Sequence, residues 1–310
     1  MRKVRFVQAD VFSDSPFGGN PVVVVPEAEG MTTEEMQALA RGMSFAETAF
    51  LTEPTLEGAR FAIRCFSPTT ELAHSGHQLL GAAFVLAAEG RVEMIEGRVQ
   101  LPIQVGKGLC QVRVDRDVRG VTRVTAMERP AEFLGRVEDL DAVAEALSVD
   151  PSHLGLGDWP PELVRTDLCG LLVPVRDLAT MRLLLPAKGA LDALLSSYGA
   201  ALALAFSLET LSPINDVHVR VFAPPLGVDE DPATGTANAA LAAYLFRRGA
   251  LGEGGLGRRG SGGQLLLRSE QGSEMGRPSV IELELDPAAD PPRLRVSGRV
   301  QRSVEGSVYY

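Results

Sequence analysis

Arg64-Cys65-Phe66-Ser67-Pro68 recurs in the second half of the chain as Arg220-Val221-Phe222-Ala223-Pro224. Each copy leads to a polar glycine loop, which reads Ser75-Gly76-His77 in the first half and Thr234-Gly235-Thr236 in the second. An internal repeat constrains the architecture before any single residue is considered. The repeat predicts two related domains, with one site shared at a pseudo-twofold interface.

An apolar stretch follows each glycine loop and predicts a helix. The spacing from Gly76 to Gly90 equals the spacing from Gly235 to Gly249, and glycine commonly follows the end of a helix. We therefore expect one helix over roughly 76–89 and a matching helix that runs from the second loop to Gly249.

The rest of the chain predicts a few further helices and many short strands. A capping box at 32–35 opens a helix that should stop near Gly42, and other helices are expected at 140–147 and, broken near Pro186, within 178–198. Strands are expected at 4–12, 22–25, 46–52, 60–67, 92–105, 108–114, 121–127, 171–175, 203–208, 217–222, 265–269, 279–285 and 294–300. Because the two kinds of element do not alternate regularly, an α+β fold is favoured over a doubly wound sheet. The first domain should span 1–120 and the second 121–293.

Composition and charge narrow the classes of function. The chain has 310 residues, enough for two domains, with 45% hydrophobic and 23% charged residues. A formal charge of −10 argues against nucleic-acid binding, although helix N-termini can still hold a small anionic substrate. We recognise no signal peptide and no apolar stretch long enough for a bilayer, so no membrane partner is expected. Three scattered cysteines fit a cytoplasmic protein without disulfides.

Glu47 is the most informative carboxylate. On a strand over 46–52 it would share a face with Ala49 and Leu51, and apolar neighbours would raise its pKa to a value that suits a general acid or base. The alternative is a second capping box over Ser44-Phe45-Ala46-Glu47. We discount it because no helical period follows and Pro54 arrives soon after.

His77 follows Gly76 at the expected start of the first repeat helix, where free N–H groups and the helix dipole could collect an anion. A lone histidine is more often an ordinary surface or core residue with a satisfied hydrogen bond. His74 and His77 have a spacing that could suggest a metal, but no further ligands follow at helical spacing. No metal and no cofactor are therefore expected.

The mirror loop in the second half reads Asp229-Glu230-Asp231-Pro232-Ala233-Thr234-Gly235-Thr236. Its carboxylates could simply compensate the helix dipole and cap the helix, which is the safer interpretation. Alternatively, Asp231 could orient His77 or a substrate amine. Thr236 could cap the helix or donate its hydroxyl to a substrate carboxylate.

At these residues the chain resembles the phenazine-biosynthesis isomerase family (PhzF-like), which has the diaminopimelate-epimerase-like fold. The resemblance runs nearly end to end, in the correct order, through six motifs: Phe17-Gly18-Gly19-Asn20-Pro21, Glu47-Thr48-Ala49-Phe50, Arg64-Cys65-Phe66-Ser67-Pro68, Ser75-Gly76-His77, Asp231-Pro232-Ala233-Thr234-Gly235-Thr236-Ala237, and Gly276-Arg277-Pro278-Ser279 with Val296-Ser297-Gly298. Six motifs together are specific, although each alone is modest.

The resemblance implies two pseudo-symmetric domains, each a mixed sheet curled around a central helix, with C-terminal strands exchanged so that residues 294–310 join the first domain. The active cleft would lie between them, and a homodimer is the family expectation. The resemblance also implies site residues. Glu47, His77 and Asp231 would be catalytic, and Asn20, Ser75, Gly76, Gly235 and Thr236 would bind substrate. The implied reaction is a cofactor-independent proton shift of the kind that isomerises trans-2,3-dihydro-3-hydroxyanthranilate.

The chain departs from the family pattern beside His77. His74 and Gln78 stand where the family has an aromatic or apolar residue and a proline, which reshapes the pocket lip and leaves the substrate open. Two alternatives remain. A two-base racemase of the same fold would use a cysteine in each glycine loop, but neither loop contains one. A ligand-binding homologue without catalysis would retain the cleft alone.

Overall fold

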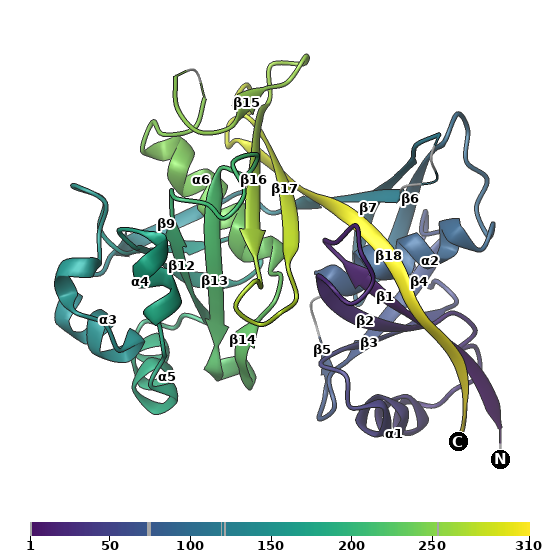
Figure 1. Ribbon diagram of the computed structural model, residues 1–310. Coiled ribbons are helices and arrows are strands. Elements are labelled where there is room, and N and C mark those ends of the chain that lie inside the picture. The colour runs from purple at the N-terminus through teal and green to yellow at the C-terminus, as the bar shows by residue number, and fades with distance from the viewer. Residues whose placement is uncertain (1, 73–75, 119, 121, 253) are drawn as a thin grey trace. The chain divides into compact units, whose positions relative to one another are not determined.

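The computed structural model describes residues 2–72, 76–118, 120, 122–252 and 254–310 (Figure 1). Helices and strands are mixed along the chain, which confirms the α+β class. The chain forms two compact units: unit 1 comprises Met1–Met127 and Ser297–Tyr310, and unit 2 comprises Glu128–Val296. The end of the chain therefore returns to the unit in which the chain begins.

Unit 1 is built mostly of strands. Its elements are β1 (Lys3–Val11), β2 (Asn20–Val25), α1 (Thr33–Met43), β3 (Thr48–Thr52), β4 (Phe61–Phe66), β5 (Glu71–Leu72), α2 (His77–Ala88), β6 (Arg98–Val105), β7 (Gly108–Arg116) and β8 (Thr122–Glu128, whose last residue belongs to unit 2), together with most of β18 (Arg293–Tyr309). The predicted capping box opens α1, since Thr32 and Glu35 cap each other's backbone N–H groups.

The sheet of unit 1 closes around α2. Pairing runs from β1 through β2, β3, β4, β6 and β7 to β8, with β2–β3 and β4–β6 parallel. β18 pairs with β1 on one side and with β8 on the other. Every residue of α2 from Gln78 to Ala87 is buried, as expected for a helix that is apolar all round. At Gly81 a Cβ would lie 2.4 Å from Val22 Cγ1, so glycine lets α2 approach the sheet closely.

Unit 2 contains more helices. Its elements are β9 (Glu132–Arg136), α3 (Leu140–Leu147), η1 (Pro151–His153), β10 (Glu162–Arg165), β11 (Cys169–Pro174), α4 (Leu178–Leu183), α5 (Lys188–Ser197), β12 (Leu202–Ser207), β13 (Val217–Ala223), η2 (Pro224–Leu226), β14 (Val228–Asp231), α6 (Gly235–Arg247), β15 (Arg258–Arg259), β16 (Leu265–Gln271) and β17 (Ser279–Asp286). The sheet runs β9-β10-β11-β12-β13-β16-β17, with β11–β12 and β13–β16 parallel.

The central helix of unit 2 is α6, whose residues Ala237–Leu245 are buried. It packs against β10, β11 and β17. Residues of β11 and β12 also join an apolar cluster with α3 and α5. These two strands are therefore covered on both faces, which explains their continuous apolar sequences.

The repeated sequence produces the same local structure in both units. β4 and β13 each continue into a short antiparallel partner, β5 or β14, and then into the central helix. The repeated arginine pairs with a glutamate in each case: Arg64 Nη2 lies 2.6 Å from Glu71 Oε2, and Arg220 Nη2 lies 2.8 Å from Glu230 Oε2. The predicted mixed sheet around a central helix is thus present in each unit.

The sequence analysis did not predict several of the short strands. β9, β10 and β14 are not among the predicted strands, and β18 continues well past the expected strand 294–300. β9 and β14 are largely exposed or half-buried, so they carry no apolar periodicity.

Candidate active site

Glu47 lies just before β3, at the end of a turn that follows α1. Ser44 adopts a left-handed conformation (φ 55°) and ends α1, so the alternative of a second capping box is wrong. The expected strand over 46–52 is also shorter than predicted, because β3 begins at Thr48. Glu47 therefore lies one residue before the strand. Its carbonyl accepts a 3.3 Å hydrogen bond from Val23 N, which fixes it beside the parallel strand β2.

The Glu47 carboxyl is largely enclosed by protein. The side chain keeps 27% of its exposure, but the Oε2 atom is buried. Burial disfavours the charged form and raises the pKa of Glu47 to about 7. The predicted direction of this shift is confirmed, although Glu47 precedes β3 and does not lie within it. At neutral pH both protonation states are populated.

His77 faces Glu47. It is the first residue of α2, after Gly76, and its side chain is 11% exposed. His77 Nε2 lies 3.3 Å from Glu47 Oε2. The structure thus brings together two of the three residues predicted to be catalytic, through a turn and a helix start that are 30 positions apart in sequence.

Asn20 and Gly76 lie on the elements that position this pair. Asn20 opens β2 and is 2% exposed, and the β2–β3 register of Val23 with Thr48 puts Asn20 and Glu47 at the N-terminal ends of neighbouring strands. The turn before Asn20 is anchored by Asp10, whose Oδ2 accepts a 2.7 Å hydrogen bond from Phe17 N. Gly76 is the N-cap of α2. Ser75, also predicted to bind substrate, lies outside the described residues, as does His74.

Asp231 is the last residue of β14 in unit 2. Its Oδ2 accepts a hydrogen bond from the hydroxyl of Thr234, which is the N-cap residue of α6 but makes no side-chain cap. The first turn of α6 contains no acidic residue. Asp229 and Glu230 pair with Lys188 and Arg220 instead. Two of the three carboxylates of this loop are thus engaged by cations, and compensation of the helix dipole by the loop stays a prediction.

Gly235 and Thr236 form the first turn of α6, so Thr236 is not a cap residue either. Thr236 Oγ1 lies 2.8 Å from Thr166 Oγ1, and the Thr166 hydroxyl also lies 3.0 Å from the Thr236 carbonyl oxygen. These contacts fix the Thr236 hydroxyl at the N-terminal end of α6, where backbone N–H groups are free of helical partners.

Sequence reasoning missed Glu128, which lies beside Thr236 in unit 2. Burial, with a further contribution from the neighbouring Asp167 carboxylate, raises the pKa of Glu128 to about 8, and a hydrogen bond with Thr236 opposes this shift. Asp167 is in turn paired with Arg129, at 2.8 Å between Oδ1 and Nε. Glu128 ends an ordinary strand pattern, so no local motif marks it.

A second histidine–glutamate contact lies in unit 2 and was also not predicted. His218 on β13 is fully buried, with Nδ1 2.9 Å from Glu270 Oε1 and Nε2 3.0 Å from Glu274 Oε1. Burial alone would lower the pKa of His218, but the hydrogen bonds and charges of both glutamates outweigh it and raise the pKa to about 9. His218 is therefore a buried cation at neutral pH.

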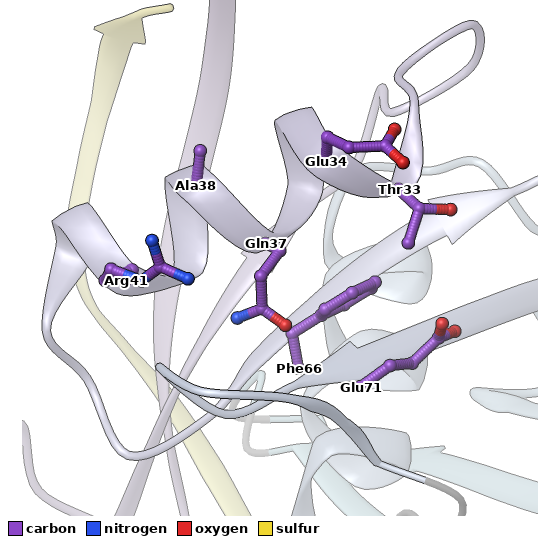
Figure 2. A pocket seen from close by; sticks show the side chains of 7 residues that line it. All are labelled: Thr33, Glu34, Gln37, Ala38, Arg41, Phe66 and Glu71. Atoms are coloured by element: carbon purple, nitrogen blue, oxygen red, sulfur yellow. The ribbon is translucent and has the colours of Figure 1, made fainter.

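A surface pocket beside α1 does not contain the candidate residues. Figure 2 shows its lining side chains, which are Thr33, Glu34, Gln37, Ala38, Arg41, Phe66 and Glu71. Within the described part of the chain, no group of three or more His, Cys, Asp and Glu side chains is arranged to hold a metal ion. Likewise, no helix among these residues is long and apolar enough to cross a membrane.

Comparisons with known proteins agree with this arrangement of motifs. Residues 9–306 match the family described as phenazine biosynthesis-like protein. The trans-2,3-dihydro-3-hydroxyanthranilate isomerase of Pseudomonas aeruginosa is 30% identical, covering 98% of this chain and 99% of its own.

Solved structures show the same fold. A phenazine biosynthesis protein of the PhzF family from Bacillus anthracis has a TM-score of 0.88 at 23% identity, with all of both chains covered. A protein described as a predicted epimerase from Pseudomonas aeruginosa has a TM-score of 0.77 at 28% identity, covering 99% of each chain. A hydroxyproline epimerase from Agrobacterium vitis has a TM-score of 0.61 at 16% identity, covering 99% of this chain and 92% of its own. The expected diaminopimelate-epimerase-like fold is confirmed.

Proposed function

This chain belongs to the phenazine biosynthesis-like family and is an isomerase, and from that premise we propose a role for Glu47. In this proposal Glu47 moves a proton between two carbons of a small carboxylate-bearing substrate. The observation that carries the proposal is the enclosed Glu47 carboxyl, whose pKa is raised to about 7 and whose Oε2 lies 3.3 Å from His77 Nε2. Such a group can both accept and return a proton at neutral pH.

The proposed reaction needs no co-reactant. The Glu47 carboxylate removes a proton from one substrate carbon, and the electron pair that is left moves into the adjoining double bond. The Glu47 carboxylic acid then returns the proton to a different carbon. Substrate and product have the same atoms and the same oxidation state, which makes the reaction an isomerisation.

The other candidate residues have supporting roles in this proposal. His77 holds the Glu47 carboxyl in one orientation, and Asp231 is the supporting carboxyl in unit 2. N–H groups at the N-terminal end of a central helix bind the substrate carboxylate. Such groups lie beside Gly76 in α2, and the Thr236 hydroxyl lies beside those of α6. Donors fixed in this way stabilise the charge that develops during proton transfer.

Two-base epimerisation is the second candidate, and Glu128 is the observation that favours it. Glu128 gives unit 2 a carboxyl with a raised pKa beside Thr236. In an epimerisation of this type a base removes the proton from one face of a carbon, and an acid delivers a different proton to the other face. One relative with a solved structure is itself described as a predicted epimerase.

The test compares turnover of trans-2,3-dihydro-3-hydroxyanthranilate by the wild type and by Glu47→Gln. NMR in deuterated water follows the reaction. The amide keeps the size of the side chain and cannot act as a base, so kcat should fall by at least about 10²-fold. Glu53→Gln, at an exposed position in the same unit, is the matched control and should retain wild-type turnover. A Glu47→Gln enzyme that turns over within about tenfold of the wild type would contradict the role of Glu47.

The hydrogen isotope distinguishes the two candidate mechanisms. A single base that returns its own proton transfers part of the substrate hydrogen to the product. Two bases place solvent deuterium in the product at every turnover. Retention of substrate hydrogen in early product supports the one-base isomerase, and its complete absence together with inversion at carbon supports the epimerase.

A further inference from the structure

The hairpin between β16 and β17 is built against the Asp231 loop. Gly272 has a φ of +80°, and a Cβ on it would lie 2.5 Å from the carbonyl oxygens of both Pro232 and Arg277. The Ser279 hydroxyl is buried and lies 2.9 Å from the carbonyl oxygens of Pro232 and Gln271. The stretch Gly276-Arg277-Pro278-Ser279, which the proposed chemistry leaves unused, thus closes a hairpin that rests on Pro232.

The side chain of Gln271 is the centre of this contact. It is fully buried at the end of β16. Its Nε2 donates a 2.6 Å hydrogen bond to the carbonyl of Asp231. Its Oε1 accepts hydrogen bonds from Asn238 Nδ2, at 2.9 Å, and from Thr234 N, at 3.3 Å. One amide therefore connects the end of β14, the N-cap and the first turn of α6.

The Gln271 amide also contacts the residues that hold the Asp231 side chain. The Thr234 hydroxyl donates to Asp231 Oδ2, and Gln271 Nε2 lies 3.4 Å from the same hydroxyl oxygen. Asn238 Nδ2 also donates to the Thr234 carbonyl, at 3.0 Å. A donor and an acceptor are needed on one side chain at this position. A carboxylate supplies no donor, and a hydrocarbon supplies neither.

We propose that Gln271 is a positioning residue that holds the Asp231 carboxyl and the first N–H groups of α6 in their working geometry. The proposal deepens the function proposed above and rests on it for its kinetic consequence. Its structural consequence does not depend on a substrate, because the contacts of Gln271 are all with residues of the chain itself.

Two variants separate positioning from folding. Gln271→Met keeps the length of the side chain and removes every polar contact, so no large cavity is made. Gln271→Glu keeps the shape and the acceptor but loses the donor while it is ionised. Ser269→Ala is the matched control, since Ser269 is fully buried on the same strand and its hydroxyl has no hydrogen-bond partner among the described residues.

Hydrogen exchange on the unliganded protein is the first readout. In Gln271→Met the amides of residues 231–240 should exchange about tenfold faster, while the other segments keep their wild-type rates. Ser269→Ala should leave the same segment unchanged. Unchanged exchange over 231–240 in Gln271→Met overturns the proposal, even if the enzyme has no activity on any tested substrate.

Kinetics on trans-2,3-dihydro-3-hydroxyanthranilate, per folded molecule, is the second readout. A displaced catalytic group lowers kcat more than it raises KM, so kcat of Gln271→Met should fall about tenfold or more with KM changed far less. In Gln271→Glu the buried carboxyl that replaces the amide regains a donor when it is protonated. The ratio of Gln271→Glu to wild-type kcat should therefore rise about fivefold from pH 8 to pH 6.

The two readouts fail in different ways. If the wild type does not turn over the substrate, the proposed function fails and the exchange result alone decides the role of Gln271. If the wild type is active and both variants keep kcat within about twofold, Gln271 has no positioning role. If Ser269→Ala lost as much kcat as Gln271→Met and exchanged as fast over 231–240, the proposal would also be overturned. Such a result would show a general effect of altering β16.

Discussion

The two units each contain a glutamate in contact with a histidine, and the two contacts have opposite electrostatics. In unit 1, Glu47 Oε2 lies 3.3 Å from His77, and burial raises the pKa of Glu47 to about 7. In unit 2, Glu270 Oε1 lies 2.9 Å from His218. Burial by itself would raise the pKa of Glu270, but hydrogen bonds from His218, Asn215 and two backbone N–H groups outweigh it and lower the pKa.

The number of donors explains the difference. Glu270 accepts hydrogen bonds from Leu211 N, Ser212 N at 3.2 Å, Asn215 Nδ2 at 2.6 Å and His218 Nδ1. Donors of this kind stabilise the ionised carboxylate. For Glu47, burial is the leading cause of the shift, and among the described residues its Oε2 has one charged neighbour, His77 Nε2 at 3.3 Å. The Glu270–His218 contact is therefore an ion pair, whereas the Glu47 carboxyl can exchange its proton near neutral pH.

The largest expected effect is on stability, at the contact in unit 2. His218→Gln removes the buried cation and leaves Glu270 and Glu274 without their main partner, so the free energy of unfolding should fall by about 3–5 kcal/mol. Urea denaturation measures the loss, with His153→Gln in the short helix η1 as the control. A loss below about 1 kcal/mol would mean that the His218 contact is not a structural ion pair.

Stability should also depend on pH through His218. Its folded pKa of about 9 lies above the ordinary value of 6.5, so the folded state binds more protons between these two values. The stabilisation is fully present below pH 6.5 and is lost as the pH rises through 9, by about 3 kcal/mol in all. Urea midpoints at a series of pH values measure this slope. It should be absent in His218→Gln, and an equal slope in that variant would assign the dependence to other groups.

The positions of the two central helices could be predicted from sequence because their signals are local. Gly90 and Gly249 have positive φ values of 67° and 70° and follow the ends of α2 and α6, as the equal spacing predicted. The glycine loops and the apolar stretches between these glycines lie within a few turns of chain. Sequence periodicity is strongest over such lengths.

The electrostatic contacts could be predicted only in part, because they join distant segments. His218 meets partners 52 and 56 positions further along the chain, and nothing around it in sequence indicates them. The raised pKa of Glu47 was predicted, but its place within a strand was wrong, since β3 begins at Thr48. Packing between remote elements therefore determines which glutamate has a raised pKa and which has a lowered one.

At the contact in unit 1 the same substitution should act on activity and not on folding. In His77→Gln the Glu47 carboxyl can stay protonated and neutral, so no unpaired charge is left buried. The free energy of unfolding should therefore change by less than about 1 kcal/mol. Loss of the orienting imidazole should lower kcat about tenfold to a hundredfold. Steady-state kinetics and urea denaturation of the same preparation measure both. A stability loss as large as that of His218→Gln would make the two contacts equivalent and end the distinction drawn between them.

The smallest expected effect is the pH dependence of activity that Glu47 imposes. In the proposed reaction the free enzyme must hold Glu47 as a carboxylate to accept the first proton. Since the pKa of Glu47 is raised to about 7, kcat/KM should reach a plateau above pH 7 and fall about tenfold per pH unit below it. Initial rates at low substrate concentration across this range measure the profile. His218→Gln, assayed under conditions in which it is folded, should leave the inflection in place, because His218 contacts Glu270 and not Glu47. An inflection near pH 4.5, the ordinary value for a glutamate, would show that the base is a solvated carboxylate, and the contrast between Glu47 and Glu270 would then have no bearing on catalysis.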